Sequence, residues 1–146
     1  MDRKEFLKIC AGGCLGLVAM QTTLPGCASH KKVNGVLMAE RLEIPVASFE
    51  RIKRGQKTYL NSVVVRNPNL QYPIAVFRFD ETQYQALLMK CTHQGTELKL
   101  YGDTLQCIAH GSEFDKAGDV TTGPATQKLR SFPALVENEK IKISLK

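Results

Sequence analysis

Four residues with strong metal-binding side chains lie in two short motifs of this chain. Cys91 and His93 form a C-x-H motif, and after thirteen intervening residues Cys107 and His110 form a C-x-x-H motif. Each motif offers one thiolate and one imidazole, and both groups are common ligands of transition metals. Such a set could hold a tetrahedral zinc ion or an iron–sulfur cluster with mixed sulfur and nitrogen ligands.

The spacing of the motifs distinguishes between these two sites. Zinc sites with two cysteines and two histidines usually pair cysteine with cysteine and histidine with histidine, a few residues apart. Here each cysteine is paired with a histidine, and a single residue separates the first pair. The chain has only three histidines, and two of them lie in these motifs, which argues against a chance grouping in a core. We therefore favour the iron–sulfur cluster over zinc.

The motifs and the residues around them resemble the cluster-binding subdomain of Rieske iron–sulfur proteins. The resemblance runs from Cys91 to about Leu129 and includes glycines after both motifs, a later turn and a proline-containing loop. Its matching residues are Cys91, His93, Gly95, Cys107, His110, Gly111, Ser112, Asp115, Gly118 and Gly123-Pro124-Ala125. The resemblance implies one [2Fe–2S] cluster per chain, with Cys91 and Cys107 on the inner iron and His93 and His110 on the outer iron.

Three positions depart from the pattern of the quinol-oxidising members of that family. Those proteins carry a disulfide between the two loops, and Thr96 and Ala109 stand where its cysteines would be. They also carry a tyrosine that donates a hydrogen bond to a ligand sulfur, where this chain has Phe114. Ser112 is kept, and by resemblance its hydroxyl bonds a bridging sulfide. Hydrogen bonds to sulfur raise the potential, so we expect a midpoint within about −150 to +300 mV and below the upper end.

Residues 1–26 resemble a bacterial export signal. A charged opening from Asp2 to Lys8 precedes a twelve-residue apolar run from Ile9 to Met20. That run is too short to cross a bilayer, which takes about 20 residues, but it has the length of a signal-peptide core. The opening is similar to a twin-arginine signal with Lys4 in place of the second arginine. This route fits a cluster that is assembled before export.

The signal-like segment ends in a sequence that resembles a bacterial lipobox, Leu24-Pro25-Gly26-Cys27. We expect Cys27 to be acylated and to become the mature N-terminus, which would place the protein on the periplasmic side of a bacterial membrane. Cleavage near Ala28, or retention of the whole segment as an anchor, are the alternatives. With lipidation, the five cysteines need no disulfide: two leave with the signal, one carries lipid and two bind iron.

The rest of the chain predicts a short tether and one domain. Residues 27–40 are polar and are expected to be the tether, with His30 as an exposed linker histidine, and residues 41–146 are enough for one domain. Short alternating segments between turn residues predict an all-β, Rieske-type antiparallel sandwich or barrel, with the cluster loops on two hairpins. The expected strands are 41–46, with Pro45 suggesting a sheet edge, then 57–65, 74–79, 84–89, a hairpin over 98–105, 130–136 and 141–145. Residues 50–55 are expected to form at most one helical turn.

The composition of the chain gives little information about its binding partners. The chain has 20 basic and 14 acidic residues, and no stripe of Lys and Arg interleaved with aromatic residues indicates nucleic-acid binding. The combined prediction is an exported, membrane-tethered one-electron carrier that serves a respiratory or periplasmic oxidoreductase, with a redox protein or membrane complex as partner. Two alternatives stay open: a ferredoxin-type carrier that feeds an oxygenase, and a small subunit without activity of its own. We do not expect a stand-alone enzyme.

Overall fold

Strands make up nearly all the regular structure of residues 30–146, which are the residues that the computed structural model describes. The predicted signal segment and Cys27 lie outside them. The strands are β1 (Lys32–Asn34), β2 (Val36–Met38), β3 (Arg41–Pro45), β4 (Glu50–Lys53), β5 (Gln56–Tyr59), β6 (Ser62–Arg66), β7 (Ile74–Arg78), β8 (Tyr84–Leu88), β9 (Lys99–Tyr101), β10 (Thr104–Gln106), β11 (Glu113–Phe114), β12 (Val120–Thr122), β13 (Ser131–Phe132), β14 (Ala134–Glu137) and β15 (Lys140–Ser144). One short 3₁₀ helix, η1, covers Val46–Phe49. The all-β prediction is confirmed.

A five-stranded sheet of order β1-β6-β7-β8-β13 lies at the centre of the molecule. Its strands β6 and β7 are buried on both faces, which explains their nearly continuous apolar sequences. Successive side chains of a strand point to opposite faces, so Val63 and Val65 enter one core while Val64 enters the other. The central sheet therefore belongs to two hydrophobic cores at once.

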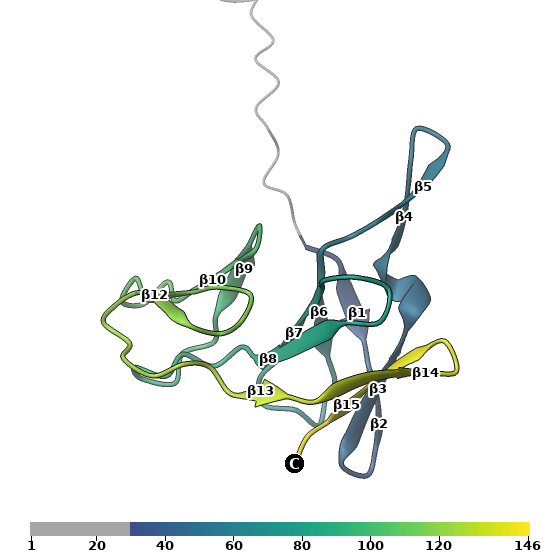
Figure 1. Cartoon of the computed structure of the whole chain (residues 1–146). Helices are drawn as coiled ribbons and strands as arrows, with labels where there is room; N and C mark the ends of the chain where they lie inside the picture. The colour runs from purple at the N-terminus through teal and green to yellow at the C-terminus, as the bar shows by residue number, and fades with distance from the viewer. Residues whose placement is uncertain (1–29) are drawn as a thin grey trace, which may run out of the picture.

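The two cores have different outer layers. On one face, the four-stranded sheet β14-β15-β3-β2 packs over the central sheet, with Leu42, Ile44 and Ile141 fully buried between them. On the other face lies a smaller sheet of order β12-β11-β10-β9, which carries the cysteine motifs. Figure 1 shows this smaller sheet set to one side of the base formed by the other two. The predicted subdomain for the cluster is thus a separate layer on a rigid β base.

Several of the predicted strand boundaries are wrong. The segment predicted as one strand over 57–65 is two strands, because β5 pairs with β4 whereas β6 pairs with β7 and, in parallel, with β1. Residues 50–53 form strand β4 instead of a helical turn. The segment 130–136 is divided at Pro133, since β13 joins the central sheet and β14 joins the outer one.

Two further expectations are corrected by the sheet order. Strand β3 as a whole is not an edge strand, because it lies between β15 and β2, but β2 pairs only with Arg41 to Glu43 and Pro45 has a partner on the β15 side alone. It is the last residue of β3, where its missing N–H interrupts no continuing ladder. The predicted tether also contributes structure: β1 pairs with β6 and β2 pairs with β3, so residues from Lys32 onward belong to the fold. No helix among residues 30–146 is long and apolar enough to cross a membrane.

Candidate metal centre

The two cysteine motifs form loops that are closed by the same backbone hydrogen bonds. In each loop the cysteine carbonyl accepts from the glycine four residues later, and the cysteine N–H donates to the carbonyl five residues later. The glycines have positive φ values of 77° at Gly95 and 78° at Gly111, a conformation that glycine adopts without strain. The four bonds are Gly95 N–H to Cys91 O at 2.8 Å, Cys91 N–H to Thr96 O at 2.8 Å, Gly111 N–H to Cys107 O at 2.9 Å and Cys107 N–H to Ser112 O at 2.8 Å.

These loops place the two cysteines inside and the two histidines outside. Cys91 and Cys107 are each only 2% exposed and lie in the same buried cluster. His93 and His110 are exposed, with ring centroids 5.0 Å apart and planes at 89°. The structure therefore brings the two cysteines together in the core and the two histidines together at the surface.

The environment of Cys107 favours its thiolate form. Burial raises the pKa of the Cys107 thiol, but hydrogen bonds from the backbone N–H groups of His110 and Ala109 lower it. The side chains of Cys91 and Thr96 lower it further, so the pKa lies below its ordinary value of 9.0. The thiolate is the form of cysteine that binds metal, so the loop backbone prepares Cys107 for that role.

A third loop holds the two cysteine loops in place. The Ala125 N–H donates to Ser112 Oγ at 3.0 Å, and the Ser112 side chain is fully buried. On the other side, Thr92 Oγ1 donates to the carbonyl of Gln127 at 2.6 Å. The predicted proline-containing loop is thus tied to both motifs. Sequence reasoning missed Thr92 and Gln127, because no local pattern marks a contact across 35 residues.

The site rests on an apolar wall shared with the central sheet. Leu98, Leu105 and Phe114 are fully buried in the same cluster as both cysteines, together with Phe77 and Leu87 of the base. This packing shields the thiols from water. Among residues 30–146, the free cysteines are Cys91 and Cys107, and no group of three or more His, Cys, Asp and Glu side chains is arranged around a single metal ion. Thr96 and Ala109 leave the loops without a disulfide, so packing and hydrogen bonds hold them.

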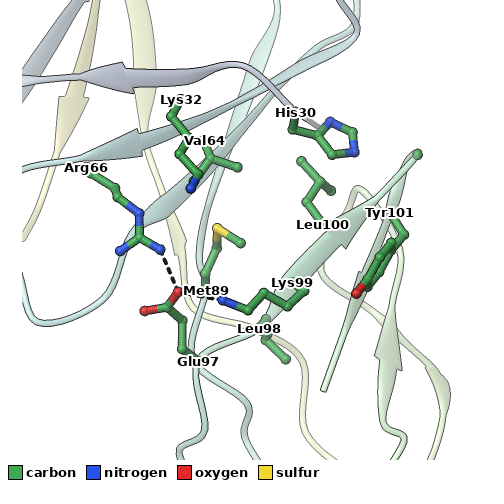
Figure 2. Close-up of a pocket in the computed structure, with 11 residues that line it drawn as sticks. His30, Lys32, Val64, Arg66, Met89, Glu97, Leu98, Lys99, Leu100 and Tyr101 are labelled. Carbon is green, nitrogen blue, oxygen red and sulfur yellow. Dashed lines mark hydrogen bonds and ion pairs between the residues drawn. The ribbon is translucent and has the colours of Figure 1, made fainter. Parts of the chain in front are cut away.

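Behind the first loop, a groove of about 450 Å³ separates the base from β9 (Figure 2). Its floor is apolar, with Val64, Met89 and Leu98, and His30 lies at its edge. The prediction that His30 is an exposed linker residue is wrong: its side chain is partly buried, and its Nδ1 lies 3.4 Å from Ser62 Oγ. Burial lowers the pKa of His30, against a smaller opposing effect of the Asp103 carboxylate.

An ion pair joins the base to the cysteine-bearing layer across this groove. Arg66 at the end of β6 donates to the Glu97 carboxylate at 2.6 Å, and the Lys99 amine lies 3.4 Å from the same oxygen (Figure 2). Burial raises the pKa of Glu97, but the hydrogen bond and charge of Arg66, with Lys99, outweigh it and bring the pKa below 4.5. The pair therefore stabilises the fold only while Glu97 is ionised.

We expect Glu97→Gln to lower the free energy of unfolding at neutral pH by at most about 1 kcal/mol, because both partners are partly exposed. Since the folded-state pKa of Glu97 is lowered, its contribution is complete above the unfolded-state value and disappears as pH falls through the folded-state value. Urea unfolding at several pH values measures this. The exposed Glu81→Gln variant is the control, and a difference that persists in acid would contradict the assignment.

The sequence of this chain matches the model of the family described as Rieske [2Fe-2S] domain over residues 43–133, more than half of the chain. No curated protein matches the chain significantly in sequence. The structure is similar to the cyanobacterial plasma membrane Rieske protein PetC3 from Synechocystis PCC 6803, with 25% identity, a TM-score of 0.50, and coverage of 57% of this chain and 86% of that one.

A second solved structure shares the fold. It is a chain from the complex of reduced oxygenase and oxidized ferredoxin in carbazole 1,9a-dioxygenase, with 23% identity and a TM-score of 0.52. The match covers 73% of this chain and 94% of the other. At this identity the likeness concerns the fold alone.

Proposed function

This chain belongs to the Rieske [2Fe–2S] family, and from that premise we propose which residues hold its cluster and where it works. A Rieske domain binds one [2Fe–2S] cluster and carries electrons. We assign the sulfur ligands to Cys91 and Cys107 and the nitrogen ligands to His93 and His110, with Ser112 as a cluster-binding residue through its hydroxyl. Two cysteines and two histidines are the donor set of a Rieske centre.

One observation supports this assignment above the others: the two thiols are buried in one cluster, while the two imidazoles are paired and exposed. The bound cluster supplies a couple that exchanges one electron at a time. The buried wall around Cys91 and Cys107 excludes water from the sulfur side. The exposed His93 and His110 rings shorten the path to a docked partner, so this end of the molecule is where we place electron exchange.

We further propose that the carrier is exported and membrane-tethered and serves a respiratory or periplasmic oxidoreductase. The support is the resemblance of residues 1–26 to an export signal and of the segment ending at Cys27 to a lipobox. The likeness to a plasma membrane Rieske protein agrees with this location. Strand β1 begins five residues after Cys27, so a lipid on Cys27 would hold the domain close to the bilayer.

A ferredoxin-type carrier that feeds an oxygenase is the second candidate. The observation that favours it is the absence of loop cysteines at Thr96 and Ala109 together with a buried Phe114, which has no hydroxyl to donate to sulfur. Both candidates use the same four ligands. They differ in where the protein is found in the cell, so the test of the proposed function must report cluster and location together.

Electron paramagnetic resonance of cell fractions provides this test. We expect the reduced protein to give a Rieske-type signal, with its low average g value, in the membrane fraction of a bacterial host. Cys27→Ala should move that signal to a soluble fraction without changing its shape, because Cys27 lies outside the cluster domain. A signal typical of four cysteine ligands, or zinc in place of iron, would contradict the ligand assignment. A wild-type signal confined to the cytoplasm would favour the oxygenase carrier.

A further inference from the structure

The hairpin of β4 and β5 projects from the base, away from the cysteine-bearing layer (Figure 1). All side chains from Arg51 to Lys57 are exposed. Ile52 is 79% exposed, more than any other large apolar side chain among the described residues. The hairpin adds nothing to either hydrophobic core through these residues. These side chains are therefore free to contact something outside the domain.

The positive charge of the domain is concentrated at this hairpin. Residues 30–146 contain 17 Lys and Arg against 12 Asp and Glu. Residues 50–59 hold four of the bases and one acid, and Lys31 and Lys32 add two more bases. The remainder of the domain is left with eleven of each sign, so its net charge is zero. The whole positive excess of the domain thus lies in these two segments.

The two basic segments are neighbours in space. His30 and Lys31 line a surface recess together with Arg51 and Tyr59. Within the described residues, no ion pair involves Arg51, Lys53 or Arg54, whereas Lys57 is paired with Glu50 at 2.6 Å. Three guanidinium and ammonium groups near the tip are therefore available to an external anion.

The hairpin is also held in one shape. Thr58 Oγ1 donates to the Arg51 carbonyl at 3.0 Å, and Arg78 lies over the Tyr59 ring, 4.5 Å from its centroid. At the tip, Arg54 and Gly55 have φ values of 52° and 76°. A two-residue turn with both φ values positive favours asparagine followed by glycine, so an arginine at the first position is a conformational disadvantage. Arg54 therefore places a basic side chain at a turn position whose backbone conformation favours asparagine.

We propose that the β4–β5 hairpin docks on the surface of a membrane containing anionic phospholipids. The hairpin docks by its tip, so that Arg51 and Lys53 on one face and Ile52 on the other all reach the bilayer surface, with Arg54 in the turn. The three bases meet the headgroups, and Ile52 enters the interface between headgroups and acyl chains. This deepens the proposed function and rests on it for the nearby bilayer. Cys27 is three residues before His30, within roughly 11 Å along the chain, so its lipid and the hairpin would meet the same surface.

Docking through the hairpin sets the orientation of the carrier. In Figure 1 the tip of the hairpin points away from the cysteine-bearing layer, while its root shares a recess with Gly102 and Asp103 of the β9–β10 turn. The cysteine loops adjoin the other ends of β9 and β10, so a domain held at the hairpin keeps the exposed His93 and His110 at the end of that layer farther from the lipid and open to a redox partner. A lipid on Cys27 is a single point of attachment, which by itself does not set an orientation.

The absence of tryptophan from the chain allows a direct test. Ile52→Trp introduces a single reporter at the hairpin, and Leu135→Trp introduces one at a matched position. Leu135 is 71% exposed on the β14–β15 hairpin, whose turn also has two positive φ values but carries Glu137 and Glu139. Both variants are prepared as the full-length holoprotein with Cys27→Ala, so that no sample is acylated. Each is mixed with phosphatidylcholine vesicles with or without phosphatidylglycerol.

With phosphatidylglycerol vesicles we expect the emission of the Ile52→Trp variant to shift to shorter wavelength and to lose quenching by acrylamide. The Leu135→Trp variant should show neither change. Replacing Arg51, Lys53 and Arg54 by glutamine should weaken vesicle binding by about fivefold per charge, roughly a hundredfold in total. The single variant Arg54→Asn should weaken binding about fivefold while leaving urea stability unchanged or higher, because asparagine suits the turn.

Each remaining outcome contradicts the docking proposal. An unchanged Ile52→Trp spectrum with anionic vesicles would exclude hairpin contact, and would leave an acidic protein as the partner to test. Equal responses at Ile52 and Leu135, or equal responses to neutral and anionic vesicles, would show that the hairpin has no special role. These results are independent of the lipid on Cys27, so a failure of docking is distinguishable from a failure of the proposed tether.

Discussion

His110→Ala should remove the cluster from the protein, whereas His30→Ala should leave it in place. We expect iron content to fall by more than about tenfold in His110→Ala, since loss of a ligand costs more than the 10–100-fold loss for outer residues. His110 is exposed, so its truncation removes no core packing and the variant should still fold. Iron analysis, the Rieske signal and far-ultraviolet circular dichroism measure these effects.

The three histidines of the chain make this comparison well controlled. His93→Ala should behave like His110→Ala, because both imidazoles lie at the same exposed end, 5.0 Å apart between ring centroids. His30 lies at the groove on the other side of the first loop and contacts Ser62. Full iron occupancy in His110→Ala, or loss of the cluster in His30→Ala, would refute the ligand assignment.

Ser112→Ala should lower both the midpoint potential and the stability. The substitution leaves the Ala125 N–H without its acceptor in a buried site, which costs about 1–3 kcal/mol of unfolding free energy. It also removes the hydroxyl that is expected to bond a bridging sulfide. A hydrogen bond worth about 1 to 1.5 kcal/mol corresponds to roughly 40–65 mV for a one-electron couple, so the midpoint should fall by that order.

A redox titration followed by the Rieske signal measures the potential, and urea unfolding measures the stability. Ser48→Ala is the matched control, because Ser48 is also a buried serine but lies in η1 of the base. It should leave the midpoint unchanged. The wild-type midpoint itself should lie inside the range of about −150 to +300 mV and below its upper end, since Phe114 has no hydroxyl. A wild-type value at the upper end would contradict the role given to these hydrogen bonds.

The two hydrophobic cores are formed by different residues, and one of them contains both cysteines. The base core is formed by residues far apart in sequence, such as Leu42, Ile74 and Ile141, and it does not include the cysteines. The second core contains both cysteines and the opposite face of the same central strands. Variants of the cluster loops are therefore expected to affect the second core first, while the base stays folded.

Local patterns were enough to predict the β class, the two motifs and the turns. The short apolar runs 74–79 and 84–89, separated by the polar residues 80–83, predict strands without knowledge of their partners, because the signal lies within each segment. The spacing of Cys91 and His93, and of Cys107 and His110, is likewise local, as are the glycines that close each loop. For these features the chemistry is contained in adjacent residues, and the sequence alone determined them.

Tertiary structure decided everything that depends on which segments meet. It divided 57–65 between two sheets, brought residues of the predicted tether into the fold, placed Pro45 at the end of β3 opposite β15 alone and placed His30 at a groove. It also tied Thr92 to Gln127 and Ser112 to Ala125 across the proline-containing loop. The physical reason is that strand partners and loop contacts are chosen by side chains distant in the chain, and no local period records them. The sequence identified the four ligand-type residues. The tertiary structure buries the two thiols and exposes the two imidazoles.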